Sequence, residues 1–67
     1  MTFKIETYDY ESSAPETRVG PMAHAYALAN RGSYYKVRAI DPVTGVVAHE
    51  WAADPRPGYD GFMVETR

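Results

Sequence analysis

YYKVRAIDPVTGVVAHEW, residues 34–51, joins two runs rich in β-branched and aromatic residues through a proline-containing turn. Pro42 suits the second position of a type I turn, and Asp41 can accept hydrogen bonds from the turn backbone. Gly45 can adopt the left-handed conformation that closes such a loop. The stretch is therefore predicted to form an antiparallel β-hairpin.

The turn also predicts a register for this hairpin. If Asp41 pairs with Val46, the next cross-strand pairs are Ile40 with Val47, Arg38 with His49 and Lys36 with Trp51. One face then holds the larger and charged side chains: Tyr34, Lys36, Arg38, Ile40, Val47, His49 and Trp51. The opposite face holds Tyr35, Val37, Ala39, Ala48, Glu50 and Ala52. A bulge at Gly45 is an open alternative, because it would slip the register by one residue and exchange the faces of the second strand.

The segment before the hairpin predicts one strand and one helix. TFKIETYDYE alternates, with Phe3 and Ile5 on one side, and polar residues end this strand near Glu11. Start and stop signals of a short helix occur in residues 20–32, GPMAHAYALANRG, where Pro21 takes the first helical position. The predicted buried stripe of this helix comprises Met22, Ala25, Tyr26, Leu28 and Ala29. An earlier start near residue 15 or 16 remains an alternative to the preferred late start.

The C-terminal part predicts a loop and a last short strand. Residues 53–61 are dense in Pro and Gly, and GFMVETR can pair at a sheet edge in its own chain or in a neighbouring one. The expected fold is therefore one α+β domain, residues 1–67. It has an antiparallel sheet of three to four strands with one helix packed on one face, in the order βαββ or βαβββ.

Length and composition limit the classes of protein that remain. A chain of 67 residues has a small core, and without cysteine it has no disulfide to supplement that core. Oligomerisation, such as a homodimer, or binding to a partner is the expected supplement. No apolar run is long enough for a membrane span, and no signal-peptide pattern is present. We expect a cytoplasmic protein that has no membrane contact.

Catalytic and metal-binding patterns are missing from the sequence. His24 and His49 lack a second ligand at a metal-site spacing, and His49 and its neighbour Glu50 point to opposite faces of a strand. No nucleophile elbow or glycine-rich phosphate loop occurs. We therefore expect no catalytic residues, no metal and no cofactor, and a protein that is not an enzyme.

Charge and aromatic content indicate binding instead. Residues 18–38 contain four basic and no acidic residues, although the net charge of the whole chain is −2. If the alanine-rich helix covers the small face of the hairpin, the exposed face carries the predicted partner-binding residues Tyr34, Lys36, Arg38, His49 and Trp51. Alternatively, Trp51 and Ile40 are core residues. A second, acidic patch is predicted at Glu6, Asp9 and Glu11, which could enter a basic groove.

The strand, the helix ending ALANRG and the hairpin YYKVRAIDPVTGVVAHEW resemble, in that order, the small βαββ proteins of bacteriophages and mobile elements. Some of these are anti-CRISPR proteins. The resemblance covers residues 1 to about 52 and rests on topology, size and the DPVTG turn. It implies a non-enzymatic protein that binds a larger host protein or nucleoprotein complex and inhibits or regulates it. The alternatives are a single-stranded nucleic-acid-binding module that uses the same sheet face, and a structural subunit that self-associates.

Overall fold

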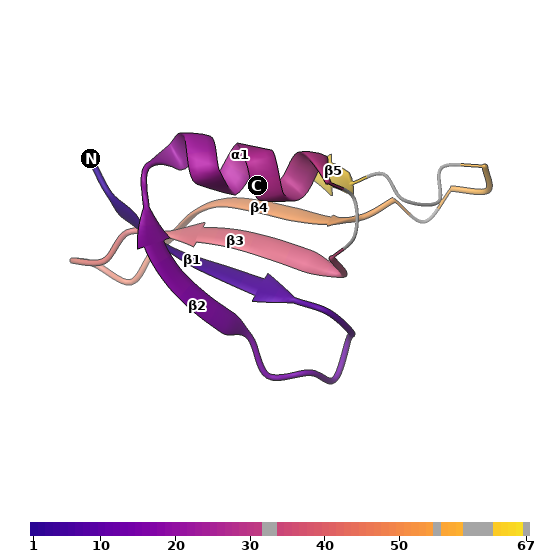
Figure 1. Ribbon diagram of the computed structural model, residues 1–67, viewed down its shortest axis with the longest axis horizontal. Helices are drawn as coiled ribbons and strands as arrows, with labels where there is room; N and C mark the ends of the chain where they lie inside the picture. The colour runs from indigo at the N-terminus through magenta and orange to yellow at the C-terminus, as the bar shows by residue number, and fades with distance from the viewer. Residues whose placement is uncertain (32–33, 55, 59–62, 67) are drawn as a thin grey trace.

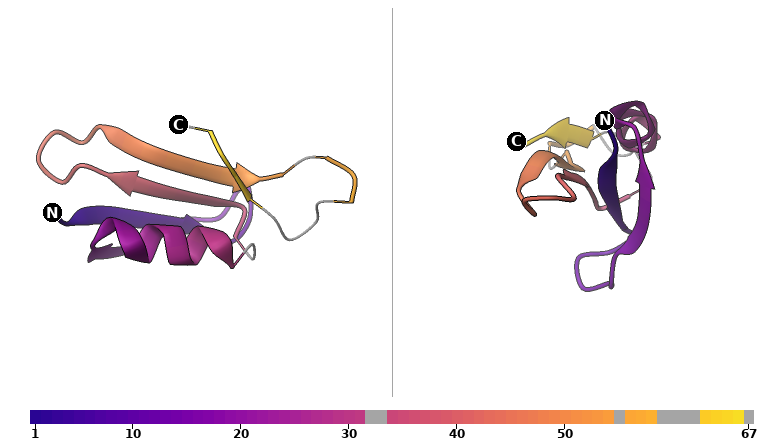
Figure 2. Two further views of the ribbon diagram at one scale, coloured as in Figure 1. Left: turned by 90° about the horizontal axis from the view of Figure 1, so that it is seen from above. Right: turned by 90° about the vertical axis from the view of Figure 1, so that its left-hand side faces the viewer.

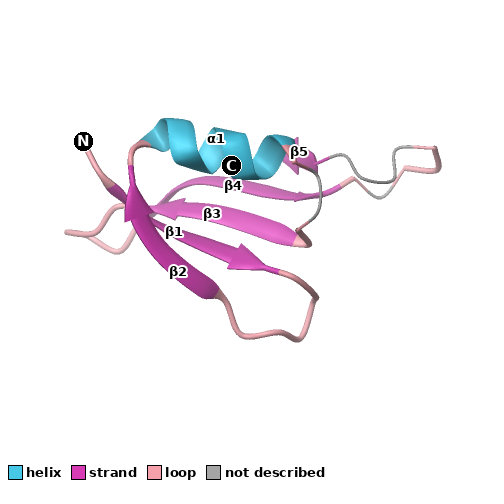
Figure 3. Cartoon of the chain, in the orientation of Figure 1, coloured by secondary structure: helices cyan, strands magenta, loops and turns pink. Residues whose placement is uncertain are grey.

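Five strands and one helix make up the described part of the chain, in the order ββαβββ (Figure 1). The computed structural model describes residues 1–31, 34–54, 56–58 and 63–66. The elements are β1 Phe3–Tyr8, β2 Glu16–Gly20, α1 Met22–Asn30, β3 Lys36–Ile40, β4 Val47–Ala53 and β5 Met63–Glu65. All neighbouring strands are antiparallel, in the sheet order β2-β1-β3-β4-β5 (Figure 3).

The predicted class, an α+β fold with an antiparallel sheet and one helix, is confirmed. The sheet has five strands rather than three to four, and β2 is the strand that the sequence did not reveal. Val19 is the largest apolar residue of β2, but it faces away from the core, with 69% of its surface exposed. The inward positions are Arg18 and Gly20, which pair with Ile5 and Phe3 of β1. Alternating hydrophobicity therefore gives no signal for this strand.

The helix begins at Met22, one residue after the predicted start at Pro21 and well after the alternative start near residue 15 or 16. Pro21 is the N-cap residue rather than the first helical residue, and the helix runs to Asn30. Ala25, Leu28 and Ala29 are buried and Met22 packs against the core, as the predicted stripe requires, whereas Tyr26 is 44% exposed. No helix in the described part of the chain is long and apolar enough to cross a membrane.

The turn between β3 and β4 has the predicted chemistry. The Asp41 carboxylate accepts hydrogen bonds from the backbone N–H groups of Val43 and Thr44, at 2.8 and 3.2 Å. The Asp41 N–H donates to the Val46 carbonyl at 2.9 Å, and Gly45 has a φ of +75°. Because β-carbons disfavour that conformation, glycine is the residue that fits this position.

The predicted register of the hairpin beyond Ile40 is wrong. Ile40 pairs with Val47 as expected, but Ala39 pairs with His49, so Ala48 is an extra residue in β4. Such a bulge moves every later side chain of the strand to the other face. Val37 consequently pairs with Trp51. The faces are exchanged as in the open alternative, although the bulge lies at Ala48 rather than at Gly45.

The core lies between α1 and one face of the curved sheet (Figure 2). The sheet contributes Ile5, Val37, Ala39 and Trp51, and the helix contributes its three buried residues. Small side chains on both surfaces allow the helix to contact β2 and β3 closely. In the described part of the chain, no element packs against the opposite face of the sheet, which we call the open face.

The C-terminal segment returns to the sheet through β5, which pairs with β4 of the same chain. The predicted loop began one residue too early, because Ala53 is still part of β4. Asp54 has no regular structure and residues 56–58 form a bend and a turn, whereas 55 and 59–61 lie outside the described residues. The buried Asp54 carboxylate accepts hydrogen bonds from the Arg56 side chain, the shortest at 2.6 Å from Nη2, and from the Arg56 backbone N–H at 3.0 Å. This pair fixes the start of the loop.

We expect the Asp54–Arg56 pair to make stability depend on pH. The Arg56 side-chain hydrogen bonds, followed by its backbone N–H, lower the pKa of Asp54 in the folded chain. The folded state then binds fewer protons than the unfolded state, so the contribution is complete above the ordinary Asp pKa of ~3.9 and is lost as the pH falls below it. Urea midpoints measured from neutral to acidic pH should fall more steeply for wild type than for Asp54→Asn. Parallel curves for the two proteins would contradict this assignment.

Candidate functional site

The five predicted partner-binding residues do not share one face. Lys36 and Arg38 lie on the open face, because they alternate with the buried Val37 and Ala39 of β3. Trp51 is only 5% exposed, and Tyr34 packs against the same core cluster. The prediction of a common surface for these residues is therefore wrong. The physical reason is the bulge at Ala48, which turns Trp51 and His49 toward α1.

The aromatic residues form a separate cluster beside the helix. The Tyr26 ring meets Trp51 edge-on at 5.3 Å between centroids, and His49 stacks on Trp51 at 5.8 Å. His49 Nδ1 also lies 2.6 Å from Glu65 Oε1 on β5. A carboxylate at that distance orients the imidazole and fixes which nitrogen carries the proton. The cluster thus ties β4, β5 and α1 together.

The open face carries a network of charged and aromatic side chains. We call Glu6, Tyr8, Lys36, Arg38 and Glu50 the open-face cluster. The strand register places these residues side by side, since Glu6 pairs with Arg38, Arg38 with Glu50, and Tyr8 with Lys36.

Glu50 is the centre of this network. Its two carboxylate oxygens lie 3.7 Å from Lys36 Nζ and 3.6 Å from Arg38 Nε. On the neighbouring strand the Tyr8 hydroxyl donates to Glu6 Oε1 at 3.3 Å, and Lys36 Nζ lies 5.7 Å from the centre of the Tyr8 ring. The Glu6 and Glu50 side chains are only 13% and 19% exposed. The cluster is therefore held flat against the sheet before any partner binds.

Two electrostatic features distinguish the cluster. Desolvation, followed by the negative charge of Glu6, raises the pKa of the Tyr8 hydroxyl, so this group stays a neutral donor. The Nε atom of Arg38 is buried and makes no hydrogen bond within the described chain, because its 3.6 Å approach to Glu50 is too long for one. Among the described residues, Arg38 Nε is the one buried side-chain nitrogen or oxygen that lacks a hydrogen-bond partner.

Apolar side chains border the open-face cluster on both sides. Val19 and Ile40 lie across from Lys4 on β2 and β3, and Val64 lies across from Ala52 on β5. These positions share the open face because Lys4 lies two residues from Glu6 on β1, and Ala52 pairs with Lys36. The surface thus combines a polar, charged centre with an apolar border.

The predicted acidic patch is divided as well. Asp9 and Glu11 are exposed in the turn after β1, whereas Glu6 belongs to the open-face cluster and lies 4.0 Å from Lys4 Nζ. The turn is closed by Ser13, whose hydroxyl donates to the Tyr10 carbonyl at 2.8 Å. Whether these acids contact a partner stays a prediction.

Metal-binding side chains are not gathered at any point of the described chain. No group of three or more His, Cys, Asp or Glu side chains that could hold a metal ion occurs within residues 1–31, 34–54, 56–58 and 63–66. The pair of His49 and Glu65 joins residues that are sixteen positions apart. Sequence reasoning missed it because the pairing of β4 with β5 follows the Pro- and Gly-rich loop, which sets no register.

Comparison with known proteins gives no relative for this chain, since no family model, curated protein or solved structure matches it.

Proposed function

We propose that this chain is a small non-enzymatic interaction protein that binds a larger host protein or nucleoprotein complex through its open face. In the sharper form of the proposal, binding inhibits a CRISPR surveillance complex, as anti-CRISPR proteins do. The observation that supports it is the open-face cluster, a preorganised set of charged and aromatic side chains on the sheet face that no element of the described chain covers.

The chemistry of this face suits a protein partner. Tyr and Arg are enriched among the residues that dominate binding energy in interfaces, and Tyr8 and Arg38 lie together here. Because Glu50 and Glu6 already hold their neighbours in place, little side-chain entropy remains to be lost on binding. Charges of both signs favour a partner surface with a complementary pattern.

Direct nucleic-acid binding through this face is the less favoured alternative. Lys36 and Arg38 both lie beside Glu50, so a phosphate would have to compete with that carboxylate. The rings of Trp51 and Tyr34, which would have stacked on bases, pack in the core instead. Self-association through an exposed Trp51 face also loses its basis, because α1 covers that face within the same chain.

The test uses purified CRISPR surveillance complexes of several types and the double variant Lys36→Gln with Arg38→Gln. We expect wild type to bind at least one complex and to reduce its binding of target DNA. The double variant should bind at least ~10-fold more weakly, as expected when hot-spot side chains are lost. Affinity is measured by biolayer interferometry and inhibition by a gel-shift assay.

A charge-matched control is Val43→Glu with Val46→Glu, which lowers the net charge equally at two exposed positions of the hairpin turn. Unchanged binding by the Lys36/Arg38 variant would show that the open face is not the interface. Failure to bind any complex would rule out the CRISPR form of the proposal. Salt-sensitive binding of a labelled single-stranded oligonucleotide would favour the nucleic-acid alternative instead.

A further inference from the structure

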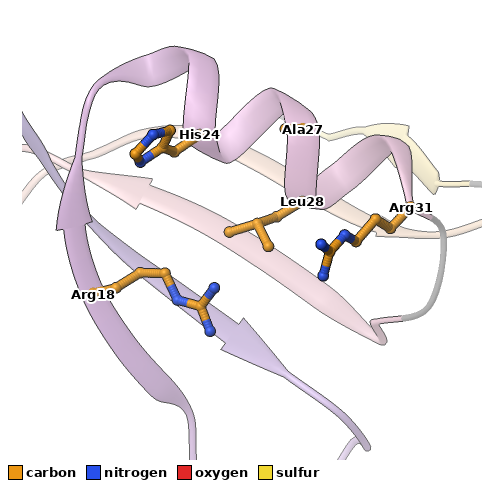
Figure 4. Close-up of a pocket in the computed structure, with 5 residues that line it drawn as sticks. All are labelled: Arg18, His24, Ala27, Leu28 and Arg31. Atoms are coloured by element: carbon orange, nitrogen blue, oxygen red, sulfur yellow. The ribbon is translucent and has the colours of Figure 1, made fainter.

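A pocket of about 160 Å³ opens between β2 and α1, on the side of the sheet opposite to the open face. It is lined by Arg18, His24, Ala27, Leu28 and Arg31 (Figure 4). Arg18 reaches into this space from β2, and His24 and Arg31 approach it from the two ends of α1. The basic middle of the sequence is thus divided between the open face and this pocket.

Positive charge is concentrated in the pocket without a matching carboxylate in its lining. Arg18 Nη2 lies 3.1 Å from Glu16 Oε1, but the Glu16 side chain is 70% exposed and does not line the pocket. Within the described part of the chain, no carboxylate forms a salt bridge with Arg31 or His24. Bringing two guanidinium groups to one cavity costs electrostatic energy that a bound anion would offset.

We propose that this pocket binds a phosphate monoester group. Guanidinium forks match phosphate oxygens in a bidentate manner, and two forks from different elements can hold different oxygens of one group. The His24 imidazole supplies a third N–H donor. The buried Leu28 and the neighbouring Ala27 form an apolar wall, which strengthens charge-assisted hydrogen bonds beside it.

The position of His24 depends on a glycine. A β-carbon added at Gly20 would lie 2.5 Å from His24 Nδ1, which is closer than such atoms approach in proteins. Gly20 is buried at the end of β2, and only Pro21 separates it from the helix. The absence of a side chain there lets the imidazole lie against the strand at the rim of the pocket. Gly20→Ala would therefore displace the ring while keeping the side chains of Arg18, His24 and Arg31.

The experiment titrates the full chain with inorganic phosphate, a nucleoside 5′-monophosphate and phosphoserine, each at constant ionic strength against chloride. Two-dimensional NMR follows the amide signals of Ala27 and Leu28. We expect saturable shifts at millimolar ligand. Arg18→Gln and Arg31→Gln should each weaken binding roughly 10-fold, the loss expected for a charge-assisted hydrogen bond. Glu16→Gln should strengthen binding, because it removes the competing carboxylate.

Lys4→Gln is the matched control, since it removes one positive charge from the open face. Its affinity for phosphate should equal that of wild type. Tighter binding of the nucleotide or of phosphoserine than of inorganic phosphate would support the proposal and identify the source of the group. Equal shifts with chloride, no shifts with any phosphate compound, or affinities unchanged in both arginine variants would overturn it. Arg31 is exposed at the helix end, so its variant tests the proposal even if Arg18→Gln destabilises the chain.

The phosphate pocket and the partner-binding face are independent of each other. Absence of phosphate binding would not count against partner binding, and absence of partner binding would not count against the phosphate pocket. The pocket faces the helix side of the sheet, whereas the open-face cluster lies on the other side. Variants in one site therefore leave the side chains of the other in place, and the two experiments report separately.

Discussion

Trp51→Ala is expected to destabilise the chain by about 3–5 kcal/mol, the usual cost of removing a buried large aromatic side chain. Its ring is packed against Tyr26 and His49 as well as against the aliphatic core. Small domains have only a few kcal/mol of stability to lose, so the variant should be largely unfolded at 25 °C. Urea unfolding followed by far-ultraviolet circular dichroism measures the loss without depending on tryptophan fluorescence.

The matched control is Val43→Ala, because Val43 is 90% exposed in the hairpin turn. Its unfolding free energy should stay within ~0.5 kcal/mol of wild type. A Trp51→Ala protein as stable as the control would mean that Trp51 lies on the open face, as the bulge-free register predicts. A large loss has a practical consequence, since Trp51→Ala would then abolish partner binding through unfolding and could not identify an interface.

The hairpin shows what the sequence determines and what it leaves open. Asp41, Pro42 and Gly45 have specific turn chemistry, and the structure has the turn that they predict. Nothing local marks Ala48 as the bulged residue, because a small side chain is accepted on either face of a strand. Burial decides the register instead: the bulge places Trp51 under α1, whereas the regular pairing would leave its large apolar surface in water.

The open-face cluster was predictable only in part. Alternation along β3 places Lys36 and Arg38 together whatever the register of β4. Glu50 joins them only because of the bulge, and Tyr8 and Glu6 join through the pairing of β1 with β3. No short sequence motif predicts that β1 pairs with β3, because β2 and α1 lie between these strands in the sequence. The pocket could not be predicted either, because strand β2 was not recognised in the sequence and Arg18 lines the pocket from that strand.

Ala25→Leu is expected to destabilise the chain by about 1–3 kcal/mol, the typical cost of overpacking a closely packed core. Ala25 is fully buried on the side of α1 that faces the sheet, with Val37 and Ala39 in the same cluster. Three more carbon atoms cannot be accommodated there unless the helix moves away from β3. Urea unfolding gives the free energy, and the same titration on Ala23→Leu gives the control.

Ala23 is exposed on the same helix, so Ala23→Leu adds the same side chain where nothing has to move. Its stability should remain within ~0.5 kcal/mol of wild type. Equal stabilities of the two variants would show that α1 is not closely packed on the sheet. The comparison also bears on the pocket, because the distance between α1 and β2 sets how closely Arg18 and Arg31 approach one anion. If Ala25→Leu lifts the helix, the folded fraction of that variant should bind phosphate more weakly than Ala23→Leu.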